Sequence, residues 1–343
     1  VGDLEVLTEL FVSHSEMNIA RGRIRAARSQ VNKALTTLEP QTNPLVAFSV
    51  YRQDARVATH LGRFIHARRS MEQAISTYMS ALKEDEHVES WIYYDFAHLT
   101  YLQWLTGNPD LAADNARRVL KETEHYESPF DFTNFLFLTN IVYRNVGDLV
   151  AVKANAEQML SIGTKYDLPL SQQSGDIFSG WLLAHQDNIL EGIEQTTRGI
   201  EGFRRMGHSM YQTHRLAMLV EMHLMAGQID EAQTVLDDAF TISGEKDEHF
   251  WDVELHRLQG DILLAGEATV EAEVSYYEAV EIARQQGAKS LELRAQMALG
   301  RLWKSQGKDA QAHQHLSELY NWFSEGFPTH DLQTARALLD QLA

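Results

Sequence analysis

The sequence predicts an all-α fold in which antiparallel helix pairs stack into one continuous solenoid. Only six of the 343 residues are prolines, and 44% of the chain is apolar. Apolar residues recur at helical spacing almost throughout, and no convincing strand-turn-strand pattern interrupts them. Similar segments also return about every 40 residues, a period that is typical of stacked helical repeats.

The repeat is clearest in the second helix of each unit. GQIDEAQTVLDDAF (227–240) has relatives in GKDAQAHQHLSELY (307–320) and in GDLVAVKANAEQML (147–160). Aligning the first small residue of each such helix gives eight anchors, which are 40 residues apart except for one step of 45. The anchors are Ala27, Ala67, Ala112, Val152, Gly192, Ala232, Ala272 and Ala312.

Each unit is predicted to be an antiparallel pair of helices. Small, large and small residues follow at offsets of four and three, as in Ala232, Leu236 and Ala239, and therefore share one helix face. A turn glycine separates the two helices in six units, whereas units five and seven carry HQDN and AGEA at that place. We expect the eight pairs to form a single domain over residues 1–343.

This spacing resembles the tetratricopeptide repeat, whose usual period is about 34 residues. The longer period here requires longer helices or loops. The resemblance implies a right-handed superhelix with a concave inner surface that can bind partners. Because each pair buries its apolar face only against its neighbours, the last pair needs a cap.

The C-terminal stretch NWFSEGFPTHDLQTARALLDQL (321–342) is predicted to provide that cap. GFP turns the chain, and residues 329–343 form a capping helix with Thr329 or Asp331 at its N-cap. The apolar stripe of this helix consists of Leu332, Ala335, Leu338, Leu339 and Leu342. A docking peptide for a partner is the alternative interpretation of the same stretch.

Three segments near the C-terminus resemble one bacterial family more specifically. They are DVELHRLQGDILL (252–264), EAEVSYYEAVEIARQQGAKSLELRAQMALGRLWKSQGK (271–308) and LYNWFSEGFPTHDLQTARALLDQL (319–342). They resemble the C-terminal repeat region of signal-transducing (STAND-type) P-loop ATPases fused to a class III nucleotide cyclase or a winged-helix transcriptional regulator. YLQWLTGNPDLA (101–112) fits the same region, so the resemblance covers residue 60 onward.

The catalytic parts of that family have no counterpart in this sequence. No G-x-x-x-x-G-K-[ST] phosphate loop occurs. The resemblance therefore implies a sensor or scaffold arm that controls an ATPase switch. The first residue is Val1, without a preceding Met or signal sequence, and we expect the chain to be cut from a longer polypeptide.

Composition narrows the classes of partner. The chain has 30 Lys and Arg against 48 Asp and Glu, a net charge of −18. Such a surface repels nucleic acid and anionic lipid, so we expect neither as a direct partner. The absence of cysteine excludes disulfides and thiolate metal sites and suits a cytoplasmic protein.

The sequence shows no pattern of catalytic or metal-binding residues. Its 15 histidines form no H-E-x-x-H motif, and His313 and His315 project to nearly opposite sides of a helix. No nucleophile elbow or phosphate-cradling glycine loop is present. We therefore expect no catalytic residue, no metal and no cofactor.

The concave surface is the predicted functional site. First-helix positions at fixed offsets before each anchor face this surface if the units have tetratricopeptide geometry. Arginines and aromatic residues, which often anchor interfaces, gather there. The candidates are Arg52, Arg56, Tyr94, Tyr101, Trp104, Asn134, Phe137, Arg144, Trp181, His185, His214 and Arg257. As an alternative, Trp104 and Trp181 fill the core between neighbouring pairs.

Together these observations predict a non-catalytic regulatory module of a larger bacterial signalling ATPase or transcriptional regulator. In this interpretation a protein, a peptide or a small-molecule inducer binds in the concave groove. The alternative is a structural arm that mediates self-association into a homo-oligomer and has no ligand of its own.

Overall fold

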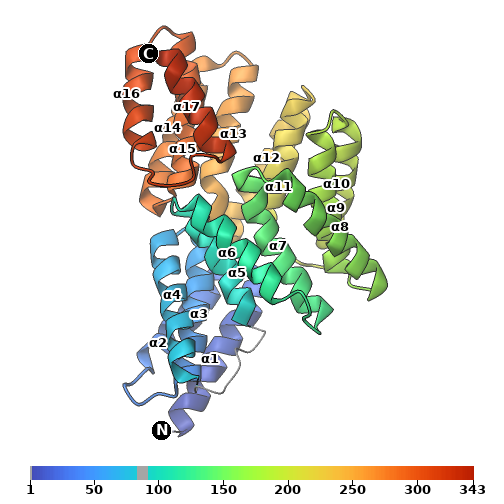
Figure 1. Ribbon diagram of the computed structural model, residues 1–343, viewed down its shortest axis with the longest axis vertical. Coiled ribbons are helices and arrows are strands. Elements are labelled where there is room, and N and C mark those ends of the chain that lie inside the picture. The colour runs from blue at the N-terminus through green and yellow to red at the C-terminus, as the bar shows by residue number, and fades with distance from the viewer. Residues whose placement is uncertain (1, 83–91) are drawn as a thin grey trace.

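The computed structural model describes residues 2–82 and 92–343, and the regular structure in these ranges is entirely helical. It comprises seventeen α-helices and a short 3-10 helix, η2 (His249–Trp251). The all-α prediction is therefore confirmed. Figure 1 shows the helices as a coiled stack with the two termini at opposite ends of the long axis.

The helices follow one another as antiparallel pairs. The first helices are α1 (Gly2–Ala20), α3 (Pro44–His60), α5 (Tyr93–Leu105), α7 (Pro129–Val146), α9 (Pro169–Ala184), α11 (Gln212–Met225), α13 (Asp252–Ala265) and α15 (Lys289–Ser305). The second helices are α2 (Ile24–Thr36), α4 (Phe64–Ala81), α6 (Pro109–Glu122), α8 (Leu149–Lys165), α10 (Ile189–Arg205), α12 (Ile229–Lys246), α14 (Thr269–Gln286) and α16 (Asp309–Tyr320). The last helix is α17 (His330–Leu342). Each helix packs on the next along the chain.

The small anchor residues allow this close packing. All eight lie on second helices and are buried. At Gly192 on α10 the approach of α9 is so close that a Cβ would overlap the carbonyl oxygen of Gly180. Proline occupies the first position of α3, α6, α7 and α9, where its missing N–H removes no helical hydrogen bond.

The turns within the pairs share one backbone conformation. Gly62 (φ +68°) and Gly227 (φ +70°) are left-handed, as glycine readily is. Asp187 (φ 65°) and Glu267 (φ 62°) adopt the same conformation in units five and seven. The sequences HQDN and AGEA therefore preserve the turn geometry without glycine at the left-handed position.

The superhelix is wound tightly enough for early units to contact late ones, along a line that we call the seam. Oγ of Ser290 on α15 donates to the carbonyl oxygen of Trp104 on α5 at 2.5 Å. The N–H of Gly326 donates to Oδ2 of Asp110 on α6 at 2.7 Å. In Figure 1, α5 and α6 accordingly lie beside the ends of the last helix pairs.

Glycines let the backbone approach closely at the seam. A Cβ at Gly147 would lie 2.9 Å from Cβ of His330, and a Cβ at Gly326 would overlap Cγ of Pro109. Gly307, in the turn of a late unit, faces open space instead. Close approach therefore adds a second constraint to the glycines of the seam, beyond their backbone conformation.

An aromatic plug fills the centre of the molecule. We define it as Tyr101, Trp104, His214, Phe250 and Trp251, all of which are at most 1% exposed. The rings of Trp104 and Trp251 have centroids 6.3 Å apart, and His214 meets Trp251 in a T-shaped contact at 4.8 Å. Because these residues come from α5, α11 and η2, the plug joins units that are distant in sequence.

Two more histidines are buried near the plug. The ring centroids of His60 and Phe250 are 5.9 Å apart, and Nε2 of His98 lies 3.0 Å from Oγ1 of Thr59. Burial, with a smaller contribution from Arg56, lowers the pKa of His60 and of His98 to about 3. Both rings are therefore neutral in the folded protein at neutral pH.

Helix α17 covers the last pair with its apolar stripe. The five stripe residues are buried: Leu332, Ala335, Leu338, Leu339 and Leu342. Thr329 occupies the N-cap position, but its hydroxyl donates to the carbonyl oxygen of Gly326 at 2.6 Å. Asp331 lies in the first turn and pairs with Arg294 at 2.8 Å.

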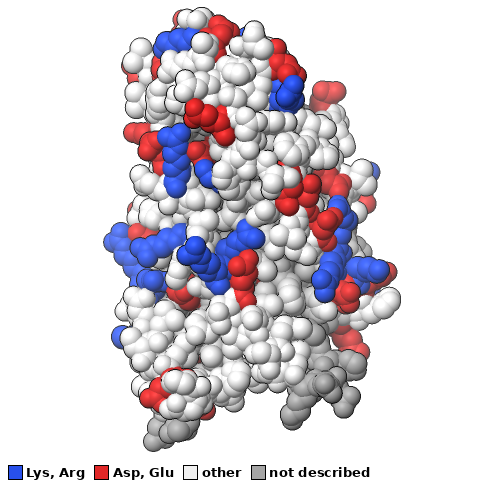
Figure 2. All heavy atoms as spheres, turned by 60° about the vertical axis from the view of Figure 1, so that its left-hand side comes forward, with Lys and Arg blue, Asp and Glu red and all other residues white. Residues whose placement is uncertain are grey.

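Charge is unevenly distributed over the surface despite the net value of −18. On the face shown in Figure 2, Lys and Arg side chains gather in a band across the middle, whereas Asp and Glu are more scattered. No helix in the described part of the chain combines the length and the apolar character that crossing a membrane requires.

Replacing Gly326 with alanine is expected to weaken the seam. Gly326 (φ +83°) and Gly307 (φ +73°) are both left-handed, so alanine costs about 1 kcal/mol or more at either position. Only at Gly326 does the new Cβ also meet a rigid proline ring. We expect Gly326→Ala to lower the free energy of unfolding by about twice as much as Gly307→Ala in urea titrations. Equal losses would show that the contact with Pro109 contributes nothing.

Replacing His98 with glutamine is expected to make stability less sensitive to acid. The unfolded histidine binds a proton below its ordinary pKa of 6.5, whereas the folded one does so only near pH 3. Its contribution to stability is therefore complete above pH 6.5 and is lost as the pH falls from there toward 3. For this group alone the loss approaches about 1.4 kcal/mol per pH unit.

The measurement compares variants, because protonation of Asp95 changes the stability in the opposite direction to protonation of His98. Burial raises the pKa of Asp95 to about 6, so this carboxyl binds its proton more readily in the folded state. The free energy of unfolding in urea is measured at about pH 7 and at about pH 5. The difference between the two values should be smaller for His98→Gln than for the wild type. The exposed His125→Gln is the control. If the free energy of unfolding of His98→Gln changes with pH as much as that of the wild type, the prediction is wrong.

Candidate functional site

Two open pockets lie among the predicted site residues, and mainly first helices line them. The N-terminal pocket has a volume of about 500 Å³ and the C-terminal pocket about 600 Å³. Nine of the twelve predicted residues line one or the other. The N-terminal pocket contains Arg52, Arg56, Tyr94, Asn134 and Phe137. The C-terminal pocket contains Arg144, Trp181, His185 and Arg257.

The structure contradicts the predicted position of the other three residues. Tyr101, Trp104 and His214 belong to the aromatic plug and are at most 1% exposed, so they do not form part of an open groove. The reason is the tight winding, which brings α15 and η2 onto the inner side of the early units. The core alternative is therefore correct for Trp104. Trp181 is 5% exposed and lines the C-terminal pocket.

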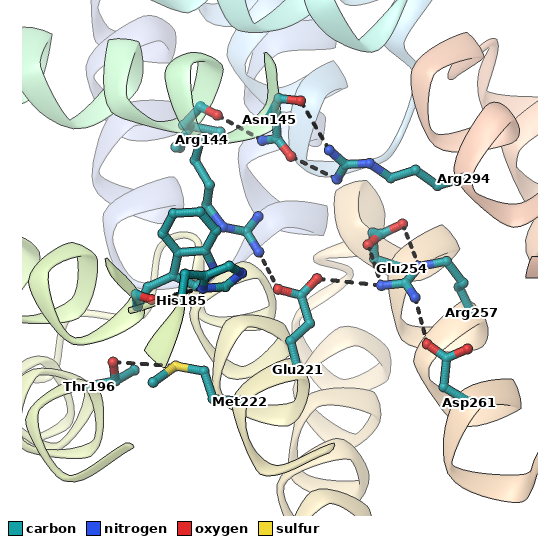
Figure 3. A network of polar contacts seen from close by, with 12 residues as sticks. Arg144, Asn145, His185, Thr196, Glu221, Met222, Glu254, Arg257, Asp261 and Arg294 are labelled. Atoms are coloured by element: carbon teal, nitrogen blue, oxygen red, sulfur yellow. Dashed lines mark hydrogen bonds and ion pairs between the residues drawn. The ribbon is translucent and has the colours of Figure 1, made fainter. Parts of the chain in front are cut away.

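A network of ion pairs crosses the C-terminal pocket. Glu221 on α11 lies between Arg144 and Arg257, as Figure 3 shows, and accepts from Nη2 of Arg257 at 3.4 Å. Arg257 also pairs with Glu254 at 2.9 Å and with Asp261 at 2.6 Å. The charges of this pocket therefore largely balance one another.

The same network determines the ionisation of Glu254. Burial alone would raise the pKa of this carboxyl, but Arg257 and Arg294 outweigh burial and hold the pKa below its ordinary value. Arg294 is itself fixed by Asp331 at 2.8 Å and by Oδ1 of Asn145 at 2.8 Å. The Asn145 contact is part of the seam, so closure of the superhelix helps to build this pocket.

Aromatic side chains form one wall of the C-terminal pocket. The guanidinium of Arg144 lies 5.0 Å from the ring centroid of Trp181, and the rings of Trp181 and His185 are 4.0 Å apart. Nε1 of Trp181 is buried and has no hydrogen-bond partner. A ring-bearing or aliphatic group fits beside these residues.

The N-terminal pocket has a different distribution of charge. Nη2 of Arg52 and Nη1 of Arg56 donate to the same oxygen, Oε1 of Glu16, at 2.8 and 3.1 Å. Arg52 also lies 3.8 Å from Asp95, whose carboxylate is fully buried. The guanidinium of Arg56 lies 5.4 Å from the ring centroid of Tyr94. The carboxylate of Glu16 is thus shared by two arginines that line this pocket.

Arg215 also lines the N-terminal pocket. It is 2% exposed, stacks at 4.1 Å on the ring of Phe203, and donates through Nη2 to the carbonyl oxygen of Met210 at 2.5 Å. Its buried Nε has no hydrogen-bond partner. Burial lowers the pKa of Arg215 to about 10, although Glu248 and Tyr211 act in the other direction.

The rest of the N-terminal pocket is mainly apolar and aromatic. Phe137 and Tyr211 meet in a T-shaped contact with centroids 5.4 Å apart. Tyr211 has φ 57°, a left-handed conformation that is unusual for a large side chain. Phe130 is 50% exposed and lines the same cavity. The pocket therefore offers rings on its walls and arginines at two of its sides.

The sequence analysis missed Arg215 and Tyr211. The offsets counted back from Ala232 selected His214, but His214 is buried in the plug, and its neighbour Arg215 lines the N-terminal pocket. Tyr211 precedes the helix and was outside the offsets altogether. A guanidinium beside buried aromatics in an acidic chain was the signal that could have identified Arg215.

Two acidic groups of the interior lie outside both pockets. Asp95 and Glu248 are the buried carboxyls whose pKa burial raises, and neither lines a pocket. Within residues 2–82 and 92–343, no group of three or more His, Asp or Glu side chains is placed to hold a metal ion. What the pockets provide is charge, aromatic rings and shape.

Comparisons with known proteins support a helical-repeat fold. No family model matches the chain. A curated relative, the uncharacterized protein R02095 of Rhizobium meliloti (strain 1021), is 22% identical over 301 residues, which cover 85% of this chain. The matched region is 28% of that protein, so the chain spans less than a third of its relative's length.

Solved structures with similar folds include several regulators. A Rap protein complexed with Competence and Sporulation Factor has a TM-score of 0.60 at 14% identity, over 98% of this chain and 97% of that one. The Rap conjugation gene regulator of plasmid pLS20, in complex with a Phr peptide, has a TM-score of 0.59 at 10% identity, over 98% and 96%. The apo form of the quorum sensor NprR from B. thuringiensis has a TM-score of 0.57 at 13% identity, over 92% of this chain and 87% of that one. At these identities the likeness shows the fold, a solenoid of the tetratricopeptide type.

Proposed function

We propose that this chain is a non-catalytic regulatory module that binds a peptide, or an extended segment of a partner protein, on its inner surface. The observation that carries the proposal is the pair of open pockets, each lined by arginines and aromatic rings from several helix pairs. Such residues are enriched at the energetic centres of protein interfaces. An extended peptide can place side chains in both pockets while its backbone follows the superhelix.

The structural relatives support a peptide as the ligand. The Rap regulator of pLS20 is in complex with a Phr peptide, and another Rap protein is complexed with Competence and Sporulation Factor. Their folds match this chain over nearly its whole length. We therefore favour a peptide over a small-molecule inducer, and over self-association as the sole role of the chain.

The module is proposed to act within a larger cytoplasmic bacterial protein. The curated relative is more than three times as long as the matched region. The C-terminal segments resemble the repeat region of STAND-type ATPases fused to a cyclase or a winged-helix regulator. In that setting the module would report ligand binding to the ATPase switch.

Ligand binding is proposed to act through the winding of the superhelix. The N-terminal pocket combines α3 with residues around the start of α11, and the C-terminal pocket combines α7 with α15 and α17. Each pocket therefore keeps its shape only while the units keep their present winding. A ligand that fits this winding binds it more tightly than it binds a more open winding, and binding therefore shifts the population toward the tight form. That shift is the proposed signal.

The proposal predicts that substitutions in the pockets weaken peptide binding. Peptides are first selected from a displayed random library against the purified chain, and their affinities are then measured by fluorescence anisotropy. Tyr94→Ala in the N-terminal pocket or His185→Ala in the C-terminal pocket should weaken the selected peptides about tenfold, or about 1.4 kcal/mol.

Tyr166→Ala is the matched control, because Tyr166, directly after α8, is 48% exposed and lines neither pocket. It should leave the affinity unchanged. If both pocket variants, still folded by circular dichroism, bind the peptides as tightly as the wild type does, the inner surface is not the binding site. A chain that yields no binding peptide and instead forms a stable dimer would favour the self-association alternative.

A further inference from the structure

We infer that the N-terminal pocket recognises a carboxylate attached to an aromatic or other bulky apolar group, such as the C-terminal residue of a peptide. This inference rests on the proposed function and adds the chemistry of the ligand. It follows from a difference between the two pockets in how their arginines are paired.

In the C-terminal pocket, the buried arginines already have carboxylate partners. Arg144 pairs with Glu221, Arg257 pairs with Glu254 and Asp261, and Arg294 pairs with Asp331. Arg301 also lines this pocket but is exposed to solvent, so an anionic ligand that used the buried arginines there would have to displace one of these carboxylates. Buried ion pairs of this kind are costly to break, because a separated partner is left without compensation.

In the N-terminal pocket, the pairing is incomplete. Arg56 donates through Nη1 to Glu16, and the same Glu16 oxygen also accepts from Arg52. Arg215 makes no ion pair within the described residues, and the hydrogen bond from its guanidinium goes to the carbonyl oxygen of Met210. The side chains of Arg56 and Arg215 therefore retain N–H groups that a ligand can use, and both line the same cavity.

Among the described acidic side chains, that of Glu248 interacts most strongly with the charge of Arg215, and its carboxylate already accepts hydrogen bonds from another residue. Oε1 of Glu248 accepts from the N–H of Thr213 at 2.9 Å and from Oγ1 of the same residue at 2.8 Å. Among the described residues that line this pocket, Asp131 is the one acidic side chain, and it accepts from the hydroxyl of Tyr126 at 3.2 Å. A carboxylate brought by a ligand can therefore pair with N–H groups that no described carboxylate contacts.

The electrostatic environment agrees with this geometry. Burial and, to a smaller extent, Arg215 lower the pKa of His208 to about 4, so this lining histidine is neutral at neutral pH. The pKa of Arg215 remains depressed to about 10, chiefly by burial. Both effects are expected where a positive charge is buried and the acidic groups near it compensate it only in part.

The walls of the pocket specify the apolar part of the ligand. Phe130, Phe137, Tyr94 and Tyr211 present rings, and Met210 adds a flexible apolar side chain. A volume of about 500 Å³ accepts an aromatic side chain together with a few backbone atoms. A guanidinium offers two parallel N–H groups, a geometry that a planar carboxylate matches.

The test uses ligands that differ only in the carboxylate. Titration calorimetry compares 3-phenylpropionate with 3-phenylpropionamide, and the peptide Gly-Gly-Phe with its C-terminal amide. We expect each acid to bind about tenfold or more tightly than its amide. Tighter binding of the peptide acid than of phenylpropionate would identify a peptide terminus as the source of the carboxylate, and the reverse order would identify a small organic acid.

Variants assign the preference to the arginines. In Arg215→Gln the ratio of acid to amide affinity should fall to about one, and in Arg56→Gln it should fall severalfold. Arg198→Gln removes an exposed arginine of α10 that is 56% accessible and lies outside both pockets, so it should keep the wild-type ratio. Because Arg215 is buried, Arg56→Gln provides the test if Arg215→Gln fails to fold.

Three results would overturn the inference. They are equal affinity of acid and amide, no binding of either up to about 10 mM, and a wild-type ratio in Arg56→Gln or in folded Arg215→Gln. Library peptides that depend on Tyr94 or His185 but bind equally well with an amidated C-terminus would retain the proposed function and reject only the carboxylate site.

Discussion

The burial of Trp104 is the constraint on which the rest of this structure depends. Its ring packs against Trp251, its carbonyl oxygen accepts from Ser290, and the guanidinium of Arg294 lies 5.2 Å from its centroid. These partners lie far along the chain, so they reach Trp104 only if the helix pairs wind tightly. Tight winding in turn closes the seam, fills the centre with the aromatic plug and leaves one open pocket on each side of it.

The two pockets differ in electrostatic character although the same kinds of residue build them. In the C-terminal pocket, each buried arginine is paired with a carboxylate, as around Glu221. In the N-terminal pocket, Arg56 and Arg215 keep N–H groups that no described carboxylate contacts, and aromatic rings fill the remaining wall. A ligand that spans both pockets would thus meet a balanced environment at one end and a cationic one at the other. That asymmetry can fix the direction in which a peptide lies.

Much of the fold could be predicted from the sequence, because the information is local. Small residues such as Ala232 and Ala239 recur where helices must approach, and the stripe of α17 is visible as leucines at helical spacing. The offsets also selected nine residues that line the pockets. The winding could not be predicted, because it depends on small angles that accumulate over many pairs. For this reason the offsets assign Tyr101, Trp104 and His214 to a groove, whereas all three lie in the plug and Arg215 lines the N-terminal pocket.

The hydrogen bonds of the C-terminal loop change how the chain should be regarded as a folding unit. Glu325 accepts from the N–H of Leu111 and Gly326 donates to Asp110, across 214 and 216 positions of sequence. In an open solenoid each repeat touches only its neighbours, so stability is a nearest-neighbour sum and folding can start anywhere. These contacts instead raise the contact order and join late repeats to early ones. The third repeat therefore completes its environment only after the loop that contains Glu325 and Gly326 has been made.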